Sequence, residues 1–385
     1  MIYKNLNSKD FVDLYSVEPE YTAECGGRFE ILGNHTDHNH GLCLAATCDL
    51  SIYGFVSKRN DNRVLVNSIG YNPVDLPLDD LSIVLNDKAS SCGLVRGIAR
   101  YFKEHGFNIG GFNLYSDSSI FAGAGVSSSA AFESLIAQIF NVLYNNGQIL
   151  KIDLAKAGQY AENTDFGKKS GLLDQIGTGY GNISYIDFVN IVNPIVEEIK
   201  FPFDDIHFVI VNTGGSHAGL NDLYSSIPVD MWNAAKKIGH EFLREGSLED
   251  LENCQSLTAI ELSRAQHFYG ENERVKDAIN ALNNHDLAGF LKAMNASRES
   301  STNLLKNMKI DVYEGSPLEA CDLAMKYMDN QGACKINGGG FAGSIICAVP
   351  NNYLYNFLKN MKAKYGDRNV VEVSVRSSAS EVNKI

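Results

Sequence analysis

The sequence lacks the features that mark membrane-spanning, secreted and disordered chains. No run of about 18 apolar residues occurs, so no transmembrane helix is predicted. The segment from Met1 to Tyr15 contains Lys4 and Asp10 where a signal peptide would have an apolar core. Proline is scarce, with 8 residues, and a hydrophobic content of 44% is too high for a disordered chain. We therefore expect a folded, cytoplasmic protein with no membrane partner.

Positive charge and paired cysteines are also in short supply. Lys and Arg number 33 against 46 for Asp and Glu, which gives a net charge of -13. A chain this acidic is not expected to bind nucleic acid over a broad surface, although a local basic pocket is compatible with it. The 8 cysteines form no Cys-x-x-Cys pair, which favours free thiols in a reducing compartment over a disulfide framework.

The length and the periodicity predict two domains of mixed structure. At about 150 residues per domain, the chain corresponds to two or three domains. The pattern changes from mixed strands and helices to mainly helices, which predicts a boundary within residues 190–215. Late strands at 344–349 and 370–375 make the second half α+β.

Apolar spacing predicts the individual elements. Alternation in residues 50–56 and 64–66, on either side of an Asn-Asp-Asn turn, predicts a β-hairpin. Asp153 is the predicted N-cap of a helix, and the glycine-rich stretch 167–181 a predicted turn. Helical periodicity is found in residues 91–107, 131–143, 231–243, 258–268, 275–294 and 317–328.

A glycine- and serine-rich segment, residues 123–131, joins a strand-like stretch to a helix. Its glycines permit close backbone approach, and the unpaired N–H groups at a helix start attract an anion. The pattern indicates either a phosphate-binding loop or a serine-capped helix after a tight turn. A Walker-type loop is excluded because no lysine lies between Gly123 and Asn146. A dinucleotide fold is excluded because residues 143–152 contain no acidic residue.

A second segment, residues 27–41, concentrates polar side chains between glycines. One interpretation is a metal site formed by His35, Asp37, His38 and His40, although residues so close in sequence rarely converge on one ion. The others are a polar turn and a polyol-binding loop, in which carboxylate and imidazole groups pair with adjacent hydroxyls.

Two carboxylates, Glu162 and Asp174, lie in different local settings. Asp174 follows Leu172 and Leu173 in a glycine-rich stretch, where partial desolvation suits a general base. Glu162 is predicted to be exposed near the end of a helix, where it suits a hard cation. Surface or capping carboxylates are the alternative for both.

Together, these stretches resemble the three signature motifs of the GHMP kinase superfamily, and the first is similar to the galactokinase signature. The motifs are residues 27–41, 123–131 and 335–343, in the family's order. The resemblance implies an α+β fold with the active site between two domains. These are an N-terminal ribosomal-S5-like α/β domain, residues 1–200, and a C-terminal ferredoxin-like α+β domain, residues 201–385.

The resemblance also implies roles for individual residues. Asp174 matches the catalytic aspartate and Arg28 the arginine beside it, while Ser129 and Glu162 match the side chains that hold Mg²⁺. The residues that match the sugar site are Asn34, His35, Thr36, Asp37, Gly171 and Tyr224, the last seven positions after His217. Those that match the ATP site are Ser68, Gly123, Ala124, Gly125, Val126, Ser127, Ser128, Ser129 and Ala130.

The implied activity is an ATP- and Mg²⁺-dependent sugar 1-kinase that converts galactose to galactose 1-phosphate. Phosphoryl transfer depends mainly on alignment and charge neutralisation. Arg28 is expected to keep Asp174 ionised and to stabilise the transferring group, while Asp174 takes or orients the proton of the anomeric hydroxyl. The expected partner is the small-molecule sugar, and the expected state a monomer or weak homodimer.

Departures from the family pattern bear on the substrate. Asn34 and His38 stand where galactokinases usually have Glu and Tyr, and Lys169-Ser170, next to Lys168, replace the usual Pro-Cys. Without the carboxylate at position 34 a negative C6 group is tolerated, so a galacturonate 1-kinase is the alternative. A non-catalytic galactose and ATP sensor is less favoured because the catalytic residues are intact, and a mevalonate or homoserine kinase because of the polyol-like first motif.

Overall fold

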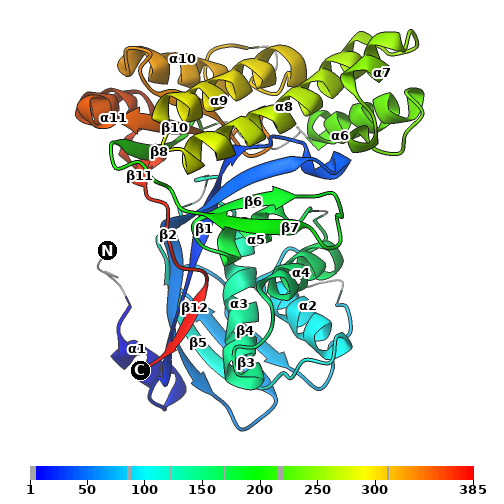
Figure 1. Ribbon diagram of the computed structural model, residues 1–385. Helices are drawn as coiled ribbons and strands as arrows, with labels where there is room; N and C mark the ends of the chain where they lie inside the picture. The colour runs from blue at the N-terminus through cyan, green and yellow to red at the C-terminus, as the bar shows by residue number, and fades with distance from the viewer. Residues whose placement is uncertain (1–5, 85–87, 122, 169, 215–220, 310–311) are drawn as a thin grey trace.

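A computed structural model describes residues 6–84, 88–121, 123–168, 170–214, 221–309 and 312–385. It contains two β-sheets with helices packed on each, stacked one above the other (Figure 1). The α+β class predicted from the sequence is confirmed. In the described parts of the chain, no helix combines the length and the apolar character needed to cross a membrane.

The first sheet has eight strands and is built around two long ones, β1 (Tyr21–Leu32) and β2 (Leu42–Lys58), which pair antiparallel. Its order is β12-β1-β2-β5-β3-β4, and β6 and β7 extend it from β2. The remaining strands are β3 (Arg63–Ser68), β4 (Val74–Pro77), β5 (Phe112–Ser118), β6 (Ile183–Asp187), β7 (Ile195–Ile199) and β12 (Glu381–Lys384).

Helices α2 to α5 pack together beside this sheet (Figure 1). The helical periodicity predicted for residues 131–143 is confirmed, because Ala131, Leu135, Ile139 and Leu143 all lie in one helix and are buried. The helices of this part are α1 (Ser8–Tyr15), α2 (Ser91–Glu104), α3 (Ser128–Asn145), α4 (Lys151–Ala161) and α5 (Leu173–Gly179). A π-helical turn, Glu162–Phe166, follows α4 directly.

The second sheet is antiparallel with the order β11-β8-β10-β9. Its strands are β8 (Ile206–Asn212), β9 (Ala333–Asn337), β10 (Ser344–Pro350) and β11 (Val370–Val373). The helices that accompany it are α6 (Asn221–Lys237), α7 (Leu248–Asn253), α8 (Ala259–Asn283), α9 (Leu287–Ser300), α10 (Pro317–Tyr327) and α11 (Asn351–Tyr365). The strands predicted at residues 344–349 and 370–375 are therefore present.

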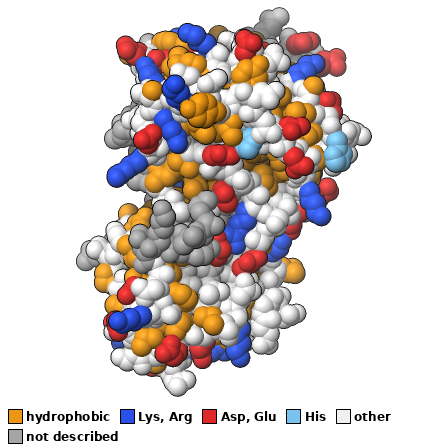
Figure 2. Space-filling model, turned by 90° about the vertical axis from the view of Figure 1, so that its left-hand side faces the viewer, with side chains coloured by type: hydrophobic (Ala, Val, Ile, Leu, Met, Phe, Trp, Pro, Cys, Tyr) orange, Lys and Arg blue, Asp and Glu red, His pale blue; other side chains and the backbone are white. Residues whose placement is uncertain are grey.

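The two sheets share one apolar core where the upper ends of β1 and β2 reach the second sheet (Figure 1). Phe29 of β1 packs on Phe208 of β8 with ring centroids 4.7 Å apart. The last strand, β12, returns to pair with β1, so the chain ends on the first sheet. In the space-filling view the molecule narrows between its two parts, and acidic and basic side chains are both present at this waist (Figure 2).

The predicted hairpin between residues 50–56 and 64–66 is wrong. Strand β5 lies between β2 and β3, pairing antiparallel with β2 and parallel with β3. The turn signal at residues 60–62 correctly marks a change of direction, but it does not decide which strands become neighbours. That choice depends on β5, which lies about fifty residues later in the chain and supplies the buried Phe112 and Leu114.

Some helix boundaries also differ from the prediction. One helix, α8, spans the predicted segment 258–268 and continues to Asn283, whereas the predicted helix 275–294 is interrupted before α9 begins. His285 has a positive φ of 55° and Asp286 caps α9, which is the local reason for the break. Asp153 lies inside α4 rather than at its N-cap, and the stretch 167–181 contains the helix α5.

Candidate active site

A cavity of about 500 Å³ opens between the two parts of the molecule. Strand β1, the turn after it, helices α5 and α6 and the loop after β9 all contribute to its wall. Seven residues predicted for catalysis or sugar binding line it: Arg28, Asn34, His35, Asp37, Gly171, Asp174 and Tyr224. Residues far apart in the sequence therefore meet at one site.

Arg28 and Asp174 form an ion pair at the inner end of this cavity. Nε and one terminal nitrogen of Arg28 each lie 2.9 Å from Oδ1 of Asp174. The other terminal nitrogen donates to the carbonyl oxygen of Gly125 at 2.7 Å. One guanidinium thus connects the carboxylate of α5 to the glycine-rich loop before α3.

The surroundings of Asp174 favour its ionised form. Burial by itself raises the pKa of this carboxyl, but Arg28 first and Lys168 second outweigh burial, so the pKa is lowered below its usual value. Asp174 therefore stays ionised at neutral pH beside a buried guanidinium. Its position in the first turn of α5 corrects the prediction of an irregular turn.

The glycine-rich loop leads into α3 with its helix start uncapped by side chains. Ser127 occupies the N-cap position with a positive φ of 56° and makes no side-chain capping hydrogen bond. The serine-capped alternative is therefore not what the structure has. The first N–H groups of α3 are available to an anion, as the phosphate-loop interpretation requires.

Two glycines of this loop are sterically required. Gly123 and Gly125 have φ values of 82° and 70°, a region that favours glycine. A Cβ at Gly123 would lie 2.4 Å from the side chain of Asn212, and one at Gly125 would lie 2.2 Å from Oγ of Ser344. Both contacts are with β-strands of the second sheet, so the loop is wedged between the two parts.

A second hollow, of about 220 Å³, lies between the start of α3 and the ends of strands β3 and β5. Ser68, Ser128 and Ser129 line it together with apolar side chains such as Phe132 and Phe166. Ser68 also shares a hydrogen bond of 2.7 Å with Ser116 of β5. Three of the residues predicted for ATP thus surround one partly apolar hollow next to the loop, while Ala124, Val126 and Ala130 are buried behind it.

Glu162 is fully buried, which corrects its predicted exposure. Its Oε1 accepts hydrogen bonds from Ser129 at 3.1 Å and from Lys168 at 2.7 Å, and its Oε2 accepts one from Gln175 at 3.1 Å. A hydroxyl and a carboxylate oxygen, both ligands that hard cations prefer, therefore lie in contact at the start of α3.

A further buried carboxyl, Glu133 of α3, was not predicted. Gln175 donates to Oε2 of Glu133 at 2.9 Å with the same nitrogen that contacts Glu162. Burial first and the charge of Glu162 second raise the pKa of Glu133 to about 8. At neutral pH Glu133 is therefore mostly protonated.

The turn after β1 presents the predicted sugar-binding side chains to the cavity. Nε2 of His35 lies 2.8 Å from the carbonyl oxygen of Gly339, and the His35 ring lies against Tyr224 with centroids 5.2 Å apart. A Cβ at Gly171 would lie 2.8 Å from Oδ2 of Asp37, so a side chain at this position would displace the carboxylate of Asp37.

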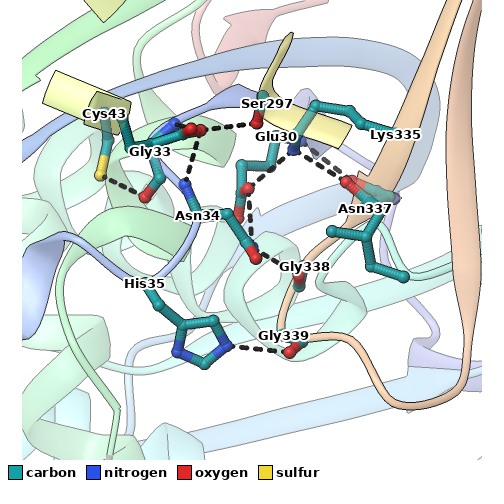
Figure 3. A network of polar contacts seen from close by, with 12 residues as sticks. Glu30, Gly33, Asn34, His35, Cys43, Ser297, Lys335, Asn337, Gly338 and Gly339 are labelled. Atoms are coloured by element: carbon teal, nitrogen blue, oxygen red, sulfur yellow. Dashed lines mark hydrogen bonds and ion pairs between the residues drawn. The ribbon is translucent and has the colours of Figure 1, made fainter. Parts of the chain in front are cut away.

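Asn34 belongs to a buried polar network that joins the first motif to the third (Figure 3). Its Nδ2 donates to Oε1 of Glu30 at 2.9 Å and to the carbonyl oxygen of Gly338 at 2.7 Å. Oδ1 of Asn34 accepts from Asn307 at 2.8 Å, and Lys335 donates to Oε1 of Glu30 at 2.9 Å. Both amide hydrogens of Asn34 are thus committed within the protein.

Thr36 is a correction to the predicted sugar site. Its side chain is fully buried, and its hydroxyl contacts the carbonyl oxygens of Gly33 at 2.9 Å and Leu42 at 2.7 Å. Thr36 therefore stabilises the turn and does not line the cavity. Lys169 and His217, which were singled out in the sequence, lie outside the described residues.

The four-residue metal interpretation of the first motif is not supported. His40 stacks on Phe242 with centroids 3.9 Å apart, while His35 faces Gly339 and His38 pairs through Nδ1 with Asn39. The side chains therefore point to different partners. Among the described residues, no group of three or more His, Cys, Asp or Glu side chains has metal-binding geometry.

The sequence analysis gave no individual role to three residues of the network, Glu30, Asn307 and Lys335, although Lys335 begins the third motif. Glu30 lies inside the first motif, two residues after Arg28 on the same face of β1, so strand alternation was the available signal. Asn307 lies outside all three motifs, and no local pattern in the sequence identified it.

Comparison with known proteins gives a consistent result. Residues 9–58 match the galactokinase galactose-binding signature, and residues 93–182 match the GHMP kinases N terminal domain. The chain is 30% identical to the galactokinase of Staphylococcus saprophyticus over 372 residues, which cover 94% of each chain. It is 28% identical to the galactokinase of Clostridium acetobutylicum over 397 residues, covering 98% of this chain and 99% of that one.

Solved structures show the same fold. The Lactococcus lactis galactokinase complexed with galactose superposes with a TM-score of 0.82 at 24% identity, covering 97% of this chain and 98% of that one. The mevalonate kinase of Methanococcus jannaschii gives a TM-score of 0.65 at 16% identity, covering 93% of this chain and 98% of that one. The GHMP kinase fold predicted from the three motifs is confirmed.

Proposed function

The chain belongs to the galactokinase family of the GHMP kinases, and from this premise we propose that it transfers the γ-phosphoryl group of ATP to the anomeric hydroxyl of galactose. The products are ADP and galactose 1-phosphate. The observation that carries the proposal is the contact of one guanidinium, that of Arg28, with both the Asp174 carboxylate and the Gly125 carbonyl. The sugar cavity and the phosphate loop meet at this residue.

Asp174 is the proposed catalytic base. The anomeric oxygen attacks the γ-phosphorus, the bond from that phosphorus to the β,γ-bridging oxygen breaks, and the hydroxyl proton passes to Asp174. The lowered pKa of Asp174 keeps it ready to accept or orient this proton. Arg28 and the uncapped N–H groups of α3 stabilise the negative charge of the transferring group.

Mg²⁺ is the proposed second cofactor. Ser129 and Glu162 would hold it, because a hydroxyl and a buried carboxylate in contact are a donor set that suits a hard cation. Bound there, Mg²⁺ would neutralise charge on the phosphates of ATP. Lys168 contacts the same oxygen of Glu162 and supplies positive charge to this carboxylate.

The remaining binding roles follow from the two hollows. We assign the sugar to the larger cavity, with His35, Asp37, Gly171 and Tyr224 as contacts, and the nucleotide to the smaller hollow beside Ser68. The division into domains at residues 1–200 and 201–385, the cytoplasmic location and a monomeric or weakly dimeric state stay predictions. Size-exclusion chromatography with light scattering tests the last of these.

No observation favours galacturonate over galactose. Although position 34 lacks a carboxylate, the cavity wall contains that of Glu30, which would repel a negative C6 group. Lys168, a cation in the cavity wall whose charge suits such a group, already pairs with Glu162 at 2.7 Å. The intact pair of Arg28 and Asp174 also argues against a non-catalytic sensor.

A coupled assay of ADP release tests the proposal. Purified protein is supplied with ATP, Mg²⁺ and one acceptor at a time: galactose, galacturonate, N-acetylgalactosamine, arabinose or mevalonate. We expect the highest kcat/KM with galactose. Turnover with galacturonate or mevalonate but not galactose would contradict the proposed substrate, and no response to any acceptor would favour a sensor.

A further inference from the structure

Glu30 combines burial, a negative charge and an uncommitted oxygen in the wall of the sugar cavity. Its side chain is only 7% exposed, yet it lines the cavity. Oε1 accepts hydrogen bonds from Asn34 and Lys335. Within the described part of the chain, Oε2 has no hydrogen-bond partner, and it is not among the fully enclosed polar atoms. A buried carboxylate oxygen in this state needs a donor from a ligand or from water.

The polar groups next to Glu30, those of Asn34 and Lys335, are already engaged in hydrogen bonds within the protein. Both amide hydrogens of Asn34 are donated to Glu30 and Gly338, and Nζ of Lys335 is fully buried against Glu30 and the Ile336 carbonyl. Lys335 and Asn34 therefore hold the Glu30 carboxylate in place through Oε1 (Figure 3). Its other oxygen, Oε2, is left for the cavity. They are positioning residues for Glu30.

The position of Glu30 relative to Arg28 indicates which part of a sugar it can reach. The two residues lie on the same face of β1 in a regular stretch of pairing with β2, so their Cα atoms are about 7 Å apart. This separation is comparable with the span of a pyranose from its anomeric oxygen to the substituents across the ring. With the anomeric oxygen at Arg28 and Asp174, the hydroxyls within reach of Glu30 are those on C4 and C6.

We infer that Glu30 is a specificity-determining residue whose Oε2 accepts a hydrogen bond from the C4 or C6 hydroxyl of the sugar. The inference rests on the proposed function, since it places the anomeric oxygen at Asp174. Glu30 of β1 thus supplies a carboxylate that accepts a hydrogen bond from a sugar hydroxyl, although position 34 has an amide. A uronate is disfavoured, because its C6 carboxylate would place hydrogen-bond acceptors against the Glu30 carboxylate, which is itself an acceptor.

The test measures kcat/KM for galactose, 4-deoxygalactose, 6-deoxygalactose and galacturonate with the wild type and the variant Glu30→Gln. The wild type should lose about 10- to 100-fold with the deoxysugar that lacks the recognised hydroxyl, as expected for a hydrogen bond to a charged group. Glu30→Gln should lose a similar factor with galactose but much less with that deoxysugar. Its discrimination against galacturonate should also decrease.

The matched control is Glu24→Gln, the same change on the same strand outside the cavity, where the carboxylate pairs with Arg376. Glu24→Gln should leave the ratios of kcat/KM between the four sugars unchanged. If Glu30→Gln fails to fold because Lys335 loses its partner, Glu30→Asp keeps the charge and withdraws the carboxylate, and should show the same selective loss.

Two outcomes separate this inference from the proposed function. Equal losses with galactose and both deoxysugars in the Glu30 variants, with an active wild type, would overturn the inference alone. An inactive wild type with galactose would overturn the proposed function itself.

Discussion

Glu271 of α8 provides a quantitative test of how the sugar-binding turn is held. Its side chain is fully buried, and Oε1 accepts hydrogen bonds from the Gly33 amide at 3.0 Å and from Ser297 at 2.7 Å. Oε2 accepts one from Nε of Arg274 at 2.7 Å. Burial alone would raise the pKa of Glu271, but Arg274 and other positive neighbours outweigh it and lower the pKa from 4.5 to about 2.

This pKa difference is a stability difference. A pKa lowered from 4.5 to about 2 corresponds to about 3 kcal/mol of folding free energy at pH 7. The unfolded carboxyl takes up a proton at a higher pH than the folded one, so acidification favours unfolding. The contribution is complete above the unfolded pKa and falls to about half of its full value near pH 3. Glu271→Gln should therefore cost about 3 kcal/mol at neutral pH and about half of that near pH 3.

Urea titrations from pH 7 to pH 3 measure this change. The chain has 1 tryptophan, Trp232, and its indole donates to the His38 carbonyl at 3.0 Å, so its fluorescence reports on this region. His267, whose pKa burial lowers to about 4, contributes acid sensitivity of its own, and the charge of Glu271 partly offsets that lowering, so the difference between the two proteins reports on Glu271 together with its coupling to His267. A difference below about 1 kcal/mol at pH 7, or one that stays constant down to pH 3, would refute the reasoning.

Three further predictions concern the catalytic site. Lys168→Met should raise the pKa of Asp174, because Lys168 is one of the charges that lower it, and should shift the acid limb of the kcat/KM profile to higher pH; an unmoved limb would contradict this. Gly125→Ala should reduce activity at least 10-fold and destabilise the protein by about 1–3 kcal/mol in thermal unfolding, because its Cβ would meet Ser344 at a positive φ. Glu162→Gln should raise the Mg²⁺ concentration for half-maximal activity about 10-fold or more, and an unchanged requirement would remove Glu162 from the metal site.

The sequence carried enough information to identify the catalytic pair and the glycine-rich loop. Arg28, Asp174 and the glycine-rich loop were predicted to meet because each matches a position of the GHMP kinase pattern, and they are in contact. Gly123 and Gly125 were correctly predicted as positions of close approach. The start of α3 was predicted because the glycine- and serine-rich segment is followed by regular helical periodicity in residues 131–143.

What the sequence could not supply depends on contacts between distant segments. Thr36 looked available to a sugar, but its hydroxyl is satisfied by carbonyls brought close only by the fold of the turn. Glu162 looked exposed because its contacts with Ser129 of α3 and Gln175 of α5 exist only in the folded chain. The roles of Glu30 and Asn34 depend on Lys335, which lies some three hundred residues away.

The same limitation explains the wrong hairpin. Local alternation located β2 and β3 correctly, yet the strand between them in the sheet comes from beyond α2. Turn residues report a change of direction, while pairing is decided by which apolar faces the finished sheet can bury.

The most direct test of the catalytic assignment is the replacement Asp174→Asn, with phosphoryl transfer and galactose binding measured on the same preparation. Turnover should fall by at least about 100-fold, while galactose, followed through Trp232 fluorescence, should bind within a few-fold of the wild type. Turnover that remains close to the wild type would show that the proton of the anomeric hydroxyl does not depend on this carboxylate, and would contradict the account.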